Sequence, residues 1–136
     1  ATTRARWSYG ASKAIDEFLA MLKLGETPAL LSRNRYAWHT GDIRVRREHD
    51  FARVDNEGRL VQGSIDRVVL LYDGEIPVAA DIIDFKTDAE IIGAADRHRD
   101  QLEAYRNAAS QVFKIDPQNI TSRLLMVKDG SVIDIV

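Results

Sequence analysis

The feature that most constrains this sequence is a central run, Val78–Phe85, that is apolar at almost every position yet contains aspartates. Side chains alternate across a strand, so a strand that is apolar on both faces is covered on both sides. Helices must supply that cover. The run therefore predicts a central strand in an α/β structure. A charged group in such a strand is costly to bury without a partner, which makes Asp84 a candidate functional residue.

Two more strands are predicted before this run. β-branched residues recur over 43–54 and over 60–72. Turn signals follow each segment, first at Asp55-Asn56-Glu57-Gly58 and then at Asp73-Gly74-Glu75. Together with the central run, these segments predict three consecutive antiparallel strands.

Helical spacing of apolar residues marks two segments that can cover the sheet. An amphipathic helix is predicted over about 12–24, with Gly25 as its stop. A longer helix is predicted over about 93–113, closed by Asp116-Pro117. The apolar stripe of this longer helix consists of Leu102, Tyr105, Ala109 and Val112.

The order of elements predicts one domain over residues 1–136. Two final strands, 123–127 and 132–135, are expected to form a hairpin across Lys128-Asp129-Gly130. A chain of 136 residues can bury one sizeable core but not two ordinary ones. The fold class is therefore α/β, with a central mixed β-sheet flanked by helices.

Composition narrows the chemistry. Without cysteine there is no disulfide framework and no cysteine-bound metal, so any metal must sit on oxygen or histidine ligands. The net charge of −2 argues against a broad basic surface. Apolar stretches are too short for a spanning helix and no secretory signal opens the chain, so we expect a cytoplasmic protein without a membrane partner.

Two carboxylates and a lysine are expected to meet on the sheet. The turn near Gly74 pairs Asp66 approximately with residues 82–84, which brings its carboxylate close to that of Asp84. Lys86 shares a strand face with Asp84. Hard carboxylate oxygens are the ligands that magnesium prefers. A plain salt bridge beside the sheet is the alternative interpretation.

Three short segments occur in an order similar to that of a known nuclease family. They are Gly63-Ser64-Ile65-Asp66-Arg67, Ile83-Asp84-Phe85-Lys86-Thr87 and Gln101-Leu102-Glu103-Ala104-Tyr105. In this combination the chain resembles the RecB/AddA-type nuclease domain of the PD-(D/E)XK superfamily, over about residues 43–135. Arg47-Glu48-His49-Asp50-Phe51 is similar to the opening of that family's first strand.

The resemblance implies a restriction-endonuclease-like core and metal-dependent hydrolysis of DNA phosphodiesters, with exonuclease activity favoured, in DNA repair or recombination. The catalytic residues that it implies are Asp66, Asp84, Lys86, Gln101 and Tyr105. It implies that Asp66, Asp84 and the backbone carbonyl of Phe85 hold Mg²⁺, or Mn²⁺ in its place. The partners implied are DNA and the helicase portion of the same or a partner polypeptide, so we expect the chain to be a fragment of a larger helicase–nuclease.

The third side-chain metal ligand is left open. The family places a histidine on an N-terminal helix, and no helical histidine precedes the first predicted strand here. Glu17, on the first predicted helix, is a candidate substitute, and a His-bearing helix upstream of the fragment is another interpretation. A catalytically incomplete nuclease-fold module that binds DNA or docks a helicase is the alternative function.

Two other patterns were weighed. Residues 6–14 resemble the Tyr-x-x-x-Lys segment of extended short-chain dehydrogenases, but no glycine-rich dinucleotide turn accompanies them. Arginines recur just before and along the first strand, namely Arg33, Arg35, Arg44, Arg46 and Arg47. They predict either a phosphate-gripping cluster or a solvated edge strand.

Overall fold

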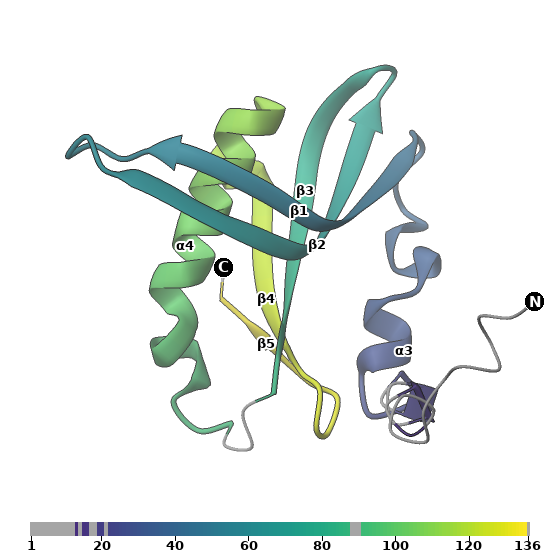
Figure 1. Cartoon of the computed structure of the whole chain (residues 1–136). Coiled ribbons are helices and arrows are strands. Elements are labelled where there is room, and N and C mark those ends of the chain that lie inside the picture. Colours follow the sequence, from purple (N-terminus) through teal and green to yellow (C-terminus); the bar gives the residue numbers. More distant parts are fainter. Residues whose placement is uncertain (1–12, 14, 17–18, 21, 88–90, 136) are drawn as a thin grey trace, which may run out of the picture.

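The computed structural model describes residues 13, 15–16, 19–20, 22–87 and 91–135 (Figure 1). Its elements are α3 (Thr27–Leu30), the 3₁₀ helix η1 (Arg33–Tyr36), β1 (Ile43–Val54), β2 (Leu60–Asp73), β3 (Ile76–Lys86), α4 (Ala94–Phe113), the 3₁₀ helix η2 (Pro117–Asn119), β4 (Ile120–Met126) and β5 (Ser131–Asp134). Part of the predicted helix over 12–24 lies outside the described residues. Its described members up to Ala20 are helical, whereas residues 22–24 form turns and a bend, so the helix ends earlier than predicted.

One five-stranded sheet in the order β1-β2-β3-β4-β5 forms the centre of the fold. β1, β2 and β3 pair antiparallel as a meander, β4 joins β3 in parallel, and β5 pairs antiparallel with β4. The parallel step needs a crossover, which α4 provides. The predicted α/β class, mixed sheet and central third strand are confirmed. β3 and β4 begin at Ile76 and Ile120, each earlier than the sequence predicted.

Both faces of β3 are covered, as its two-sided apolar pattern predicts. Ile82 packs with Leu102 of α4 in the main core. On the opposite face, Ile83 packs against Leu30 of α3, and Tyr36 of η1 covers the neighbouring part of the sheet. Figure 1 shows α4 and α3 on opposite sides of the sheet. Each fully buried branched side chain contributes about 1.5–3 kcal/mol.

The long helix α4 lies on the sheet through a stripe of small and large apolar side chains. Its buried members include Leu102, Tyr105, Ala108 and Ala109. The prediction that Val112 belongs to this stripe is wrong, because Val112 is 50% exposed. Phe113 makes the last-turn contact instead and packs against the ring of His49, with centroids 5.2 Å apart. Within the described segments, no helix combines the length and apolar character that a bilayer crossing requires.

The β1–β2 hairpin changes face near its middle. Ile65 and Val68 both lie in the main core, although residues three apart on a regular strand point to opposite faces. The change occurs beside Glu48 of β1, whose φ of +48° is a left-handed conformation that few residues other than glycine adopt. Such a conformation costs on the order of 1–3 kcal/mol and is often found at functional sites. Asp66 lies at this irregularity.

Candidate active site

Asp66 of β2 and Asp84 of β3 face each other across the sheet. The pair Arg67↔Ile83 sets the register, so the next residues along the two strands, Asp66 and Asp84, lie opposite one another. A bulge between Leu71 and Tyr72 is what produces this register. Without it the pairing near the turn would place Asp66 opposite residue 83, whose side chain points to the other face.

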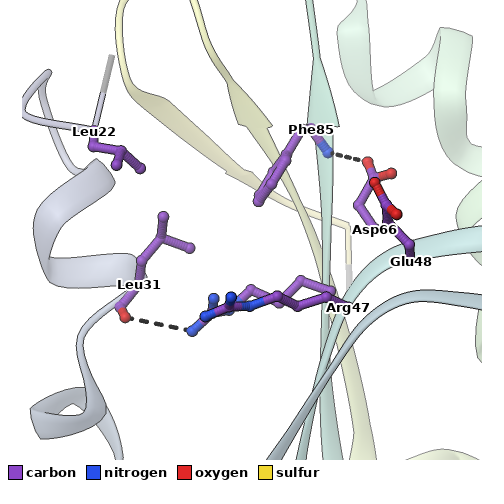
Figure 2. Close-up of a pocket in the computed structure, with 7 residues that line it drawn as sticks. Leu22, Leu31, Arg47, Glu48, Asp66 and Phe85 are labelled. Atoms are coloured by element: carbon purple, nitrogen blue, oxygen red, sulfur yellow. Dashed lines mark hydrogen bonds between the residues drawn. The ribbon is translucent and has the colours of Figure 1, made fainter. Parts of the chain in front are cut away.

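Backbone and side-chain contacts hold the two acids in place. The Phe85 N–H donates to Asp66 Oδ2 at 2.8 Å (Figure 2). Asp84 is only 2% exposed, and its carboxyl group lies within hydrogen-bond reach of Asp66. The structure therefore brings together the two carboxylates that the sequence placed on neighbouring strands.

A chain of polar contacts links these acids to α4. Lys86 Nζ lies 2.8 Å from Asp84 Oδ2 and donates to Gln101 Oε1. Gln101 Nε2 in turn donates to the Tyr105 hydroxyl at 2.8 Å. Lys86 reaches Asp84 because residues two apart share a strand face, and Gln101 and Tyr105 align because residues four apart share a helix face. All five side chains that the resemblance implies are catalytic therefore lie in one connected group.

The site is short of positive charge. Burial, followed by the hydrogen bond with Asp66, raises the pKa of Asp84 to about 6, although the nearby Lys86 acts in the opposite direction. Burial, followed by the charges of Asp84 and Asp66, also raises the pKa of Tyr105. Asp84 Oδ2 is buried and accepts no well-directed hydrogen bond, despite the nearby Nζ. Such an oxygen is suited to bind a cation.

A complete metal site would need ligands besides these two carboxylates. Among the residues that the structure describes, no three histidine or acidic side chains gather as a metal-binding group. Glu17, the candidate third ligand, lies outside the described residues. Phe85 is a residue of β3 whose backbone N–H donates to Asp66, and the role of its carbonyl stays a prediction. Two carboxylates are compatible with magnesium, which keeps several waters and takes substrate phosphate as a further ligand.

Replacing Asp84 with asparagine is expected to stabilise the metal-free protein at neutral pH. The raised pKa means that the Asp84 contribution to stability is fully present below its usual 3.8 and is lost as pH rises through about 6. Asparagine carries no such charge. In EDTA at pH 7, the free energy of unfolding of the variant should therefore be higher than that of the wild type by on the order of 1–2 kcal/mol. Urea unfolding at pH 4.5 and pH 7 measures this difference.

The control for that experiment is Asp73→Asn, because Asp73 is an exposed acid at the end of β2. It should change stability by less than about 0.5 kcal/mol at either pH. A stability advantage of Asp84→Asn that does not grow between pH 4.5 and pH 7 would contradict the raised pKa of Asp84.

Gly63 of the Gly-x-x-Asp segment is required for space. A Cβ at this position would lie 2.9 Å from Phe51 Cζ and 3.3 Å from Tyr105 Cε1. These two rings pack edge to face at 5.6 Å. Gly63→Ala is therefore expected to cost about 1–3 kcal/mol in unfolding free energy. Gly74→Ala, where nothing lies within 4 Å but φ is +61°, reports the cost of backbone strain alone.

The structure adds two residues that the sequence reasoning did not assign to the site, Glu48 and Arg67. Glu48 lies opposite Asp66, between the pairs Arg47↔Arg67 and His49↔Ile65. Glu48, Asp66 and Arg67 line one pocket of about 760 Å³. Counting residues back from the turn at 55–58 would have paired Glu48 with Asp66, so the signal was present in the hairpin spacing.

The predicted arginine cluster is divided among different environments. The guanidinium carbon of Arg44 lies 4.2 Å from the centre of the Tyr72 ring, and Arg35 lies 3.5 Å from Asp81. Arg47 faces the pocket beside Arg67, and Arg46 is exposed. Neighbouring residues of a strand point to opposite faces, so the sequence cluster does not form one surface.

Comparisons with protein-family models and with curated proteins find no match to this chain. Support for a function therefore comes from the geometry of the site and from the resemblance of its motifs. The geometry contributes two opposed carboxylates, a lysine that contacts one of them, and a glutamine–tyrosine pair that holds the lysine.

Proposed function

We propose that this chain is a metal-dependent deoxyribonuclease of the RecB/AddA type, with a restriction-endonuclease-like core and Asp66 and Asp84 as its metal-binding carboxylates. The observation that carries the proposal is the connected group running from Asp66 and Asp84 through Lys86 to Gln101 and Tyr105. Its members are spread over two strands and a helix. A surface salt bridge does not need this arrangement, whereas a reaction centre does.

The residues present fit a bound magnesium or manganese ion. Asp84 offers a buried oxygen that accepts no well-directed hydrogen bond from the described residues, and Asp66 offers the oxygen that the Phe85 amide does not bind. When bound, such an ion supplies a water of lowered pKa and neutralises charge on the scissile phosphate. The carbonyl of Phe85 is a further ligand in this proposal.

Lys86 supplies a positive donor next to the carboxylates. An ammonium group has three N–H donors. One lies toward Asp84 and one is donated to Gln101, which leaves one for a phosphate oxygen or the attacking water. Preorganised donors of this kind stabilise the charge that develops on a pentavalent phosphorus. Gln101 and Tyr105 act as positioning residues, because they hold Nζ in place.

The second candidate function is a nuclease fold that binds DNA or docks a helicase without cutting. It is favoured by the observation that, in the described segments, no group of three acidic or histidine side chains is placed to hold a metal ion together. In either case we propose DNA as partner, together with the helicase portion of the same or a partner polypeptide, in DNA repair or recombination.

A cleavage assay separates the two. The purified chain is incubated with linear single- and double-stranded DNA in magnesium or in EDTA, beside Asp84→Ala and the surface control Asp73→Ala. We expect degradation that requires magnesium, that is kept in Asp73→Ala and that falls about 10³-fold or more in Asp84→Ala. Binding of intact DNA under all metals would support the non-catalytic module, and neither binding nor cleavage would contradict both functions.

A further inference from the structure

Two arginines lie directly opposite each other beside the proposed metal site. Arg47 of β1 and Arg67 of β2 form a cross-strand pair, and both line the pocket of about 760 Å³ that Asp66 also borders (Figure 2). Like charges that face each other on neighbouring strands repel. An anion bound between the two groups would offset this repulsion.

In the described part of the chain neither guanidinium forms an ion pair, although Arg67 is also attracted by the charge of Asp81. Among the described residues, Arg67 Nη2 donates to the carbonyl of Leu31 at a long 3.4 Å. Its Nε is buried and has no acceptor in the same part of the chain. A guanidinium carries five N–H donors in a planar fork, and a buried donor without an acceptor is unfavourable. Within the described residues, most donors of this pair therefore have no protein acceptor.

The rest of the pocket limits what that ligand can be. Leu22 and Leu31 form one wall, and the Phe85 side chain forms another, so the arginines project into a partly apolar recess. Figure 2 shows both leucines directed toward this space, with the carboxylate of Asp66 beyond the strand. The recess combines two planar forks with an apolar wall. Such a combination suits a phosphate that carries a sugar better than it suits a bare cation or an apolar molecule.

We propose that Arg47 and Arg67 together bind a phosphate group of a nucleic-acid strand, with the attached sugar against Leu22, Leu31 and Phe85. This inference rests on the proposed nuclease function, since Asp66 lines this pocket and also contributes a carboxylate to the proposed metal site. The phosphate lies between the two guanidiniums and accepts from both. The pair thereby adds a second point of attachment for the strand.

Binding measured without metal tests this subsite. Fluorescence anisotropy in EDTA compares single-stranded oligonucleotides carrying a 5′-phosphate or a 5′-hydroxyl, with inorganic phosphate as competitor. We expect Arg67→Gln and Arg47→Gln each to weaken binding about tenfold and to lower the salt slope by about one, whereas Arg46→Gln, on the same strand but facing away, changes affinity less than about threefold. Loss confined to the 5′-phosphorylated strand assigns the site to a terminal phosphate, and equal loss assigns it to an internal phosphodiester.

Thermal unfolding distinguishes a binding pair from a structural one. Removal of one charge from a repelling pair is expected to leave the melting temperature of Arg67→Gln equal to or above that of the wild type. Inorganic phosphate should raise the melting temperature of the wild type and of Arg46→Gln by the same amount, and that of Arg67→Gln by less. A variant that melts lower yet binds oligonucleotide and phosphate as the wild type does would overturn the proposal.

Different results would contradict the proposed nuclease function and the proposed phosphate subsite. Oligonucleotide binding that depends on Arg47 and Arg67, without cleavage in magnesium, would leave the subsite standing and remove the nuclease function. Cleavage that continues with unchanged Michaelis constants in both arginine variants would leave the nuclease function standing and remove the subsite.

Discussion

Replacement of Lys86 by methionine is expected to lower the rate of magnesium-dependent DNA cleavage about 10³-fold while divalent-cation binding is kept. Methionine retains most of the aliphatic stem but removes the charge and all three donors. Lys86 Nζ lies 2.8 Å from Asp84 Oδ2 and donates to Gln101, so its loss removes the positive group beside the carboxylates of the proposed metal site. The two carboxylates remain, and Asp84 no longer has a competing cation beside it. Single-turnover kinetics measure the cleavage rate, and a manganese titration measures whether cation binding is kept.

Lys128→Met is the matched control, because Lys128 is an exposed lysine in the turn between β4 and β5. It should cleave DNA at the wild-type rate. If Lys86→Met lost activity only in proportion to a loss of manganese binding, Lys86 would be a structural support of the metal ligands, and the proposed role as an electrostatic donor would be wrong.

The largest effect on stability is expected at Asp81, which lies on the other face of β3. Asp81 is 4% exposed and accepts from the Tyr36 hydroxyl at 2.7 Å, from Thr121 Oγ1 at 2.9 Å and from Arg123 Nε at 2.9 Å. Burial, followed by the hydrogen bond to Asp81, raises the pKa of Tyr36. Asp81→Ala would leave a partly buried guanidinium and a buried hydroxyl without their acceptor. We expect a loss of about 3–5 kcal/mol in unfolding free energy.

Urea unfolding of Asp81→Ala should be compared with that of Asp134→Ala. Asp134 also pairs with Arg123, at 2.9 Å, but its side chain is 75% exposed. An exposed ion pair contributes at most about 1 kcal/mol, so the two losses should differ several-fold. Equal losses would show that the buried network around Asp81 contributes no more than a surface ion pair.

The order of the first three strands and the meeting of the two acids were readable from the sequence because they follow from local signals. Turn residues separate the three strands, and two of their glycines, Gly58 and Gly74, adopt the positive φ that such turns require. Hairpin spacing then brought Asp66 close to residues 82–84. The choice of Asp84 within that range depends on the bulge between Leu71 and Tyr72, for which the sequence offers no distinct pattern.

Other parts of the site depend on contacts between distant segments, which local patterns do not report. Arg47 and Arg67 look like members of separate motifs until β1 pairs with β2. Glu48 adopts its left-handed conformation inside a strand, where side-chain alternation alone predicts a regular backbone. The sequence reasoning assigned no role to Asp81, because its partners Tyr36 and Arg123 come from segments on either side of it in the chain.

Titration of the chain with Mn²⁺, followed by the electron paramagnetic resonance signal of the unbound ion, measures metal binding with no substrate present. If Asp66 and Asp84 form a metal site, the wild type and Asp73→Asn should each take up manganese at that site, and Asp66→Asn and Asp84→Asn should each weaken its uptake about 100-fold or more. Manganese uptake of equal strength in all four proteins, or no uptake by the wild type, would contradict a cation held between these two carboxylates.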